Sequence, residues 1–253
     1  MTLAHAVKDI RYHDEIAAEY DRTVVEPRAS TNDLVYRKIA RVVRGGEWLL
    51  DLGCGTGHLT SRIGDRFHKV MAVDHSAGML QQAAANLASL GMKHVDFRQQ
   101  DALEFLQAAP SGQFDVVGCV GFLHHLQAPV IVRALSDIHR ILKDRGYAIF
   151  QEPINLPAGS LPKPIERWNS KSVVVGMVYC HTESPPDERP LDRELFASWL
   201  SETGFRVRFV NRNWEIFPHH LPPSLVDRTV IRLMNMRYGG IGNVFSVVVD
   251  KRS

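Results

Sequence analysis

The 253-residue sequence predicts an α/β fold with a mostly parallel sheet and helices on both faces of that sheet. Short apolar runs alternate with longer amphipathic segments over residues 46–151, which is the pattern of repeated strand–helix units. The clearest single signal is the stretch LLDLGCGTG at 49–57, where an apolar run ends in an acid and a glycine-rich turn follows. Such a stretch is typical of a buried parallel strand that leads through a tight loop into a helix.

Two helices are expected before the sheet. The first covers about 10–20 and should be ended by Pro27, and the second runs from Thr31 or Asn32 to Val43 before Gly45 and Gly46. The expected strands are 48–52, 70–73, 95–98, 114–120 and 147–151, and helices after Gly57 and over 76–90, 102–106 and 128–142 should connect them. This alternation of strands and helices implies a parallel sheet with right-handed crossovers.

The pattern changes after Glu152. Residues 153–190 are rich in proline and predict an insertion over the carboxyl edge of the sheet, part lid and part substrate wall. Regular structure resumes in a helix over 193–203 and a strand over 205–210; a second insertion over 211–242, with a helix at 224–236, precedes the last strand over 244–249. We expect one domain, 1–253, made of an N-terminal helical arm (1–45), a cofactor-binding core (46–151) and substrate-side insertions with the final strands (152–253).

Composition excludes several classes of protein. The net charge of +2 and the scattered arginines give no electrostatic footprint for nucleic acid. Cys54, Cys119 and Cys180 lie far apart, which suits free thiols in a reducing cytoplasm. No run approaches the length of a membrane span, and the N-terminus lacks the apolar core of a signal peptide. His219 and His220 have no acid at ligand spacing, so no metal site is expected.

Three acids are expected at the carboxyl ends of neighbouring strands. Asp51, Asp74 and Asp101 fall at or near the ends of three expected strands, and ligands of open parallel sheets bind at this edge. An acid in the position of Asp74 can accept from a ribose hydroxyl, which fits a nicotinamide dinucleotide as well as a nucleoside.

The spacing of the glycines distinguishes between a dinucleotide and a nucleoside. A dinucleotide turn has the pattern G-x-G-x-x-G, whereas here Gly53, Gly55 and Gly57 alternate and His58 takes the place of the third glycine. Asp51 would also lie badly beside a pyrophosphate and suits a cation instead. A phosphate-free, positively charged nucleoside is therefore favoured over a nicotinamide cofactor.

Five motifs together resemble the class I S-adenosyl-L-methionine-dependent methyltransferases of the small-molecule "methyltransferase domain 11/25" type. They are LLDLGCGTGHLT, VMAVDHSAGML, RQQDALEF, FDVVGCVGFLHHL and LKDRGYAIFQEP, in family order within residues 10–151. The resemblance implies a Rossmann-like, seven-stranded sheet with an antiparallel last strand, for which 244–249 is the expected segment. It also implies S-adenosyl-L-methionine as the methyl donor and S-adenosyl-L-homocysteine as the product.

The resemblance further implies a set of cofactor-binding residues. Asp51 should lie near the amino group of the methionyl part, Asp74 should accept from both ribose hydroxyls, and Asp101 should accept from the adenine N6 amine. The full expected set is Tyr20, Asp51, Gly53, Cys54, Gly55, Gly57, Asp74, His75, Met79, Asp101, Ala102 and Cys119.

The pair His124 and His125 follows the fourth strand, where methyl donor and acceptor would meet. A neutral imidazole there could take a proton from a hydroxyl, although either ring could instead be structural. Glu152 is a further acid expected at the pocket. We expect O-methylation of a small hydrophobic or aromatic natural product, with C- or N-methylation as the alternative.

Other classes remain as alternatives. An RNA or protein methyltransferase needs a basic face that the sequence does not show. A non-catalytic binding module is disfavoured because the acids at all three strand ends are intact, whereas decayed members of the family tend to lose them. The expected partners are a small-molecule acceptor and a second copy in a homodimer, and neither nucleic acid nor a membrane is expected.

Overall fold

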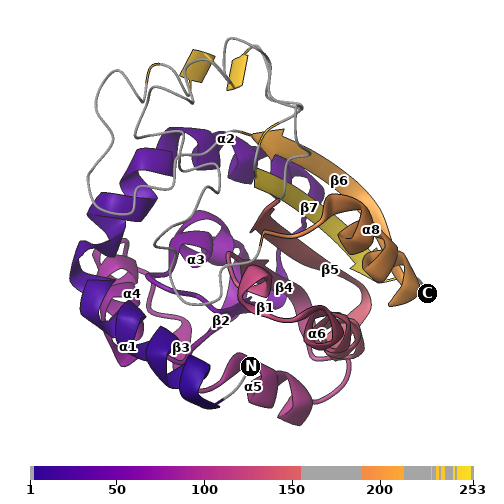
Figure 1. Cartoon of the computed structure of the whole chain (residues 1–253), viewed down its shortest axis with the longest axis horizontal. Coiled ribbons are helices and arrows are strands. Elements are labelled where there is room, and N and C mark those ends of the chain that lie inside the picture. The colour runs from indigo at the N-terminus through magenta and orange to yellow at the C-terminus, as the bar shows by residue number, and fades with distance from the viewer. Residues whose placement is uncertain are drawn as a thin grey trace.

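The computed structural model describes residues 3–154, 190–213, 229, 232–233, 235–236, 242 and 244–251. Its centre is a seven-stranded sheet with the order β3-β2-β1-β4-β5-β7-β6 (Figure 1). The strands are β1 (Gly46–Leu52), β2 (Phe67–Asp74), β3 (Val95–Gln99), β4 (Phe114–Val120), β5 (Leu142–Pro153), β6 (Phe205–Asn213) and β7 (Val244–Lys251). The first five pair in parallel, and β7 runs antiparallel between β5 and β6. The predicted Rossmann-like sheet with an antiparallel last strand is thus confirmed.

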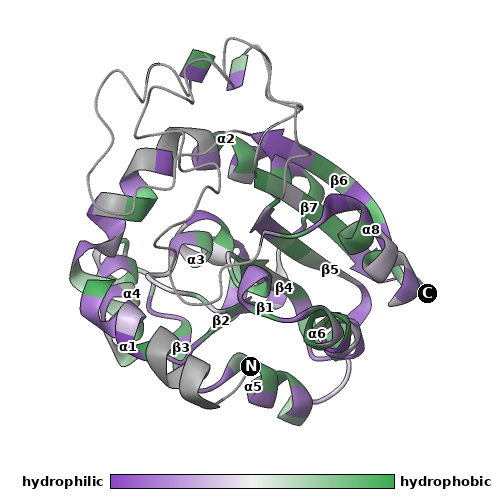
Figure 2. Cartoon of the chain, viewed as in Figure 1, coloured by the Kyte–Doolittle hydropathy of each residue, from purple (hydrophilic) through white to green (hydrophobic). Residues whose placement is uncertain are grey.

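The central strands are buried on both faces, which is why they read as continuous apolar runs in the sequence. Leu49, Leu50 and Leu52 of β1 are fully inaccessible to solvent, and every residue of β7 except its last is buried. Figure 2 accordingly colours much of β5 and β7 as hydrophobic.

Helices cover both faces of the sheet (Figure 1). One core cluster packs α5 (Ala102–Ala108), α6 (Ala128–Ile141) and α8 (Arg193–Glu202) on one face. On the other face a second cluster includes α2 (Glu26–Val42) and α3 (His58–Ile63), and α4 (Ala77–Ser89) lies over β2 and β3. Short 3₁₀ turns cover Gly64–Arg66 (η2) and Leu123–His125 (η3).

The N-terminal arm differs from the prediction. Helix α1 (Leu3–Tyr20) passes into α2 through a single π-helical turn, η1 (Asp21–Val25), without a break. Pro27 was expected to end the first helix, but it stands in the first turn of α2. Proline is tolerated there because the amides of that turn have no partner within the α-helix. A π turn inside a helix is rare and frequently marks a functional site.

Several strands are longer than predicted, and β2 begins at Phe67 instead of residue 70. β5 begins at Leu142 instead of residue 147, and β6 continues to Asn213, three residues into the expected second insertion. The predicted lid over 153–190 falls almost entirely outside the described residues. Of the helix predicted over 224–236, the structure describes 229, 232–233 and 235–236, and these residues are helical. Among the helices that the structure describes, none combines the length and apolarity needed to cross a bilayer.

Replacing Phe150 by alanine is expected to lower the free energy of unfolding by about 3–5 kcal/mol. Phe150 is fully buried in β5, and its ring packs edge-on against Phe196 and Phe205 at centroid distances of 5.6 and 6.3 Å. Urea denaturation followed by circular dichroism measures the loss. The control Val207→Ala removes an aliphatic side chain that is 47% exposed, so a comparable loss there would contradict the cavity argument.

Candidate functional site

A pocket opens at the carboxyl edge of the sheet. The strands contribute four lining residues at their carboxyl ends: Asp51 of β1, Asp74 of β2, Val120 of β4 and Gln151 of β5. Strand order reverses between β1 and β4, and ligands of open α/β sheets bind at such a switch point. The three acids predicted at strand ends, Asp51, Asp74 and Asp101, all reach this one pocket.

The glycine loop after β1 turns its backbone toward the pocket. Gly53, Gly55 and Gly57 have φ values of +66°, +50° and +82°, a region that side chains disfavour. A Cβ on Gly55 would meet nothing within 4 Å, so open space lies directly over this part of the backbone. A Cβ on Gly53 would lie 3.1 Å from the ring of Phe122, so this glycine allows the loop after β4 to approach. The loop can therefore support a ligand with its main chain.

Asp74 ties the glycine loop to the start of α4. Its Oδ2 accepts from the amide of Gly55 at 2.8 Å, and its Oδ1 accepts from the amide of Ser76 at 2.9 Å. Ser76 in turn caps α4 by accepting from the amide of Met79 at 3.0 Å. Each carboxylate oxygen has a second lone pair, so Asp74 can still accept from a ligand's hydroxyl groups.

Asp51 is a buried acid at the end of β1. Its Oδ2 accepts from the hydroxyl of Thr60 at 2.6 Å and from the amide of the same residue at 3.1 Å. Burial raises the pKa of Asp51 to about 7 although these bonds oppose the shift, and the negative charge of Asp74 raises it slightly further. A cation placed beside Asp51 would favour its ionised form.

The remaining predicted cofactor residues divide into two groups. Ten of the twelve predicted residues line the pocket: Tyr20, Asp51, Gly53, Cys54, Gly55, Asp74, His75, Met79, Asp101 and Ala102. Gly57 and Cys119 do not line it: Gly57 caps α3 against Leu87, and the fully buried Cys119 lies within β4. Asp101 also caps α5, because its Oδ1 accepts from the amides of Leu103 and Glu104.

The arm forms a wall of the pocket that the sequence analysis missed, except for Tyr20. Every fourth residue of the arm lines the pocket: Tyr12, Ile16, Tyr20, Val24, Arg28 and Asn32. In a regular α-helix, with 3.6 residues per turn, residues spaced four apart gradually move around the helix axis. The wider π turn at Asp21–Val25 compensates for this rotation, so that the row stays on the side that faces the pocket. This four-residue spacing of ring, aliphatic and polar side chains was the available signal in the sequence.

Two aspartates dock the arm. Asp14 accepts from the hydroxyl of Ser76 at 2.6 Å and from the amide of Gly78 at 2.9 Å, and these bonds lower the pKa of Asp14. Asp21 accepts from the hydroxyl of Thr56 at 2.6 Å and from the amide group of Asn86 at 2.6 Å. The arm is thus held to both the glycine loop and α4.

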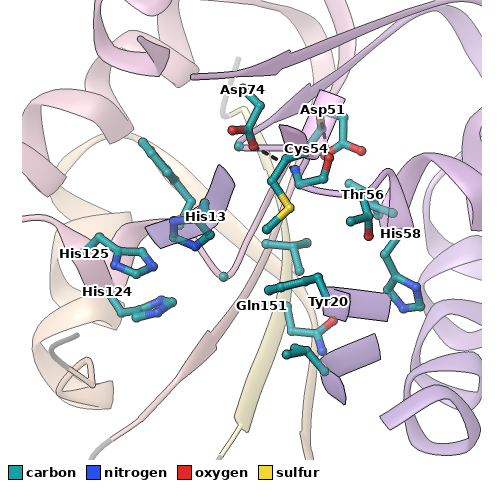
Figure 3. Close-up of a pocket in the computed structure, with 18 of the residues that line it drawn as sticks. His13, Tyr20, Asp51, Cys54, Thr56, His58, Asp74, His124, His125 and Gln151 are labelled. Carbon is teal, nitrogen blue, oxygen red and sulfur yellow. Dashed lines mark hydrogen bonds between the residues drawn. The ribbon is translucent and has the colours of Figure 1, made fainter. Parts of the chain in front are cut away.

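The two predicted catalytic histidines lie at a different part of the pocket (Figure 3). The rings of His124 and His125 have centroids 4.1 Å apart, and His13 of α1 lies 6.1 Å from His125. The Nδ1 atom of His124 is 2.7 Å from Oε2 of Glu152 at the end of β5. Burial lowers the pKa of His124 to about 3, and the nearby charge of Arg28 lowers it further. The imidazole is therefore neutral.

His58, in the place of the third dinucleotide glycine, also lines the pocket. Its ring packs edge-on against Tyr36, and burial lowers the pKa of His58 to about 4. A neutral, bulky ring at this point fits poorly with a pyrophosphate in contact with the loop.

The aspartates and the histidine pair lie in two different parts of the pocket. Figure 3 shows Asp51 and Asp74 together beside the glycine loop, whereas His124 and His125 point into the pocket from another side. The acids and the uncovered loop backbone fit a nucleoside that carries positive charge, and the imidazoles fit a polar group of a second molecule. Within the described residues, His, Cys, Asp and Glu form no cluster of three that could hold a metal ion.

Known proteins match the same part of the chain. A family described as "Methyltransferase domain" matches residues 49–146. The chain is 35% identical over 110 residues to the ubiquinone biosynthesis O-methyltransferase of Pseudomonas paraeruginosa, covering 44% of this chain and 45% of that protein. It is 34% identical over 164 residues to the demethylmenaquinone methyltransferase of Leptospira interrogans, covering 61% and 62%. The chain thus spans about half of the first relative and somewhat more of the second.

Solved structures share the fold at low sequence identity. The complex of DhpI with S-adenosylhomocysteine has a TM-score of 0.65 at 16% identity, with all of both chains covered. A SAM-dependent methyltransferase from Archaeoglobus fulgidus has a TM-score of 0.57 at 19% identity, covering 88% of this chain and 94% of that one. Family match, relatives and fold agree with the arrangement of glycine loop and acids. Residues 49–146 therefore belong to a methyltransferase domain, and the fold of the described chain is that of class I S-adenosylmethionine-dependent methyltransferases.

Proposed function

We propose that this protein transfers a methyl group from S-adenosylmethionine to an oxygen of a small hydrophobic or aromatic acceptor. The observation that carries the proposal is the division of one pocket into an acidic part and a part with a neutral imidazole. The acids suit a cationic nucleoside. The imidazole of His124 suits an acceptor whose hydroxyl proton must leave.

In this proposal the glycine loop, Asp51, Asp74 and Met79 would hold the donor, which supplies an electrophilic methyl group on a sulfonium. His124 would accept the hydroxyl proton of the acceptor through Nε2. Arg28, whose charge acts on His124, would stabilise the oxyanion that results. Ile16, Val24 and Val25 of the arm would exclude water from the reacting atoms.

The relatives' names guide the choice of acceptor. One is an O-methyltransferase of ubiquinone biosynthesis and another is a demethylmenaquinone methyltransferase. We propose an acceptor with a hydroxylated ring and an apolar substituent. Aromatic and aliphatic side chains of the pocket, among them Tyr12, Ile16, Phe122 and Leu126, would contact the apolar part.

The experiment is a transfer assay with donor carrying an isotopically labelled methyl group. The panel contains catechols and alkylated hydroquinones, with matched anilines and fully O-methylated rings. Label on oxygen of the hydroxylated compounds alone is expected. Label on nitrogen or carbon would contradict O-methylation and support N- or C-methylation instead. Tight binding of S-adenosylhomocysteine without transfer to any compound would indicate a binding module.

Binding of S-adenosylhomocysteine is expected to weaken as pH falls below about 7. Asp51 has a pKa of about 7 without ligand, and a nearby ammonium group favours the ionised acid. Below this pKa the acid must first lose a proton, so the affinity falls by up to about tenfold per pH unit. Calorimetry between pH 5.5 and 8 measures the slope. In Asp51→Asn the slope should disappear, and an equal slope in both proteins would exclude Asp51 as its origin.

We also propose that residues 1–253 act as one domain in the cytoplasm, and that two copies associate as a homodimer. Cys54 and Cys119 are free, buried thiols, as suits a reducing compartment. Light scattering of the purified protein measures its molar mass in solution, and a monomer at micromolar concentration would contradict the proposed dimer.

A further inference from the structure

We propose that Glu152 is a positioning residue that sets the tautomer of His124: when its carboxyl group is ionised, it holds the ring proton on Nδ1 and leaves the lone pair of Nε2 facing the pocket. The inference rests on the proposed function, because it concerns the group that would accept the acceptor's proton. It adds a residue outside the expected cofactor-binding and catalytic sets, and it explains how a buried histidine can act as a base.

Glu152 is the best-satisfied buried acid of the pocket. The residue is 1% exposed, and its Oε1 accepts from the amides of Phe122 and Leu123 at 3.1 and 2.9 Å. Its Oε2 lies 3.4 Å from the amide of His124 and 2.7 Å from Nδ1 of the same residue. The carboxyl group therefore holds the whole turn η3, backbone and ring together.

The backbone bonds restrict how the proton can be arranged. Amides can only donate, so both lone pairs of Oε1 are used, and only the contact between Oε2 and Nδ1 can vary. If Glu152 is ionised, Nδ1–H donates to it and Nε2 is left as an acceptor. If Glu152 is protonated, its O–H donates to Nδ1 and the ring proton moves to Nε2. One carboxyl proton thus decides whether His124 presents an acceptor or a donor to the pocket.

Several groups face this pair from the surrounding elements. They are His13 of α1, Arg28 of α2, Cys119 of β4 and His125 of η3. Burial raises the pKa of Glu152 to about 8, against the lowering effect of the three amides. Burial keeps His124 uncharged, so the titrating member of the pair is Glu152. The acceptor form of Nε2 is then gained as pH rises through about 8 and lost as pH falls below it.

The variant Glu152→Gln tests this with almost no change in shape. The amide oxygen of the new side chain must accept from Phe122 and Leu123, because its NH₂ group would oppose two donors. The NH₂ group is then left facing Nδ1 and donates to it. The substitution should therefore fix the opposite tautomer, with the proton on Nε2, at every pH where the protein is folded.

The direct readout is ¹⁵N NMR of histidine-labelled protein, which distinguishes protonated from unprotonated ring nitrogens. In the wild type, Nε2 of His124 should be unprotonated at pH 9 and become protonated as pH falls through about 8. In Glu152→Gln it should be protonated throughout. A wild-type spectrum with the proton on Nε2 at pH 9 would overturn the proposal. This spectrum needs neither donor nor acceptor, so it can fail independently of the methyltransferase assignment.

Kinetics supply the second readout once an acceptor is in hand. Glu152→Gln should lower kcat at least tenfold and remove its rise with pH, while the dissociation constant of S-adenosylhomocysteine stays unchanged. The matched control is Glu194→Gln, the same chemical change at a side chain that is 87% exposed, and it should retain the wild-type profile. An unchanged pH profile in Glu152→Gln would also overturn the proposal.

Discussion

Replacing His124 by glutamine is expected to lower kcat by about 100-fold or more, because glutamine cannot accept a proton at neutral pH. The affinity for S-adenosylhomocysteine should change little, since the acids and the glycine loop lie in another part of the pocket. Glutamine can still reach toward Glu152, so the loss would come from proton transfer more than from a collapsed turn. Steady-state rates at saturating donor, together with calorimetry, separate the two effects.

The adjacent His125 provides the comparison. Its ring lies against that of His124, but the bond to Glu152 is made by His124. His125→Gln should therefore cause a clearly smaller loss of kcat. If the two variants lose activity equally, the pair acts as scaffold. If neither loses activity, the acceptor needs no base, which would favour a nucleophile that is already unprotonated.

Replacing Asp74 by asparagine is expected to weaken S-adenosylhomocysteine binding by about 100-fold, the equivalent of one or two charge-assisted hydrogen bonds. Asparagine would also place an NH₂ group against the amide of either Gly55 or Ser76, both of which donate to Asp74. The substitution therefore removes acceptors for the ribose and disturbs the loop beneath it. Calorimetry measures the loss, and thermal denaturation shows how much comes from folding.

Asp101→Ser is the matched control, because serine preserves the cap on α5 while removing the carboxylate. It should weaken binding less than Asp74→Asn, since a single contact with the adenine is expected there. A larger loss at Asp101 would reverse the ranking of the two acids.

The sequence predicted best what depends on neighbouring residues. The strand ending at Leu52, its glycine turn and the acids at strand ends are local patterns. Strand order and crossover handedness then bring them to one edge of the sheet. The sequence alone therefore predicts that Asp51, Asp74 and Asp101 line one pocket, as they do.

Contacts between distant residues could not be predicted in this way. Asp14 and Ser76 are 62 residues apart, and Asp21 and Asn86 are 65 apart, so no local pattern indicates that the arm docks on α4. The sequence singled out His124 and Glu152 separately, but their bond depends on where β5 ends relative to η3. The prediction that Pro27 ends the first helix was wrong because proline is compatible with the first turn of a helix as well as with the residues after its end.

The unbroken arm constrains how this chain can change. One residue of an α-helix corresponds to a rotation of about 100° around its axis. Removing one residue between Asp21 and Val25 would therefore turn either Tyr12 and Ile16, or Arg28 and Asn32, away from the ligand. Point substitutions can vary the chemistry of this wall, whereas single-codon insertions or deletions would shift half of it at once.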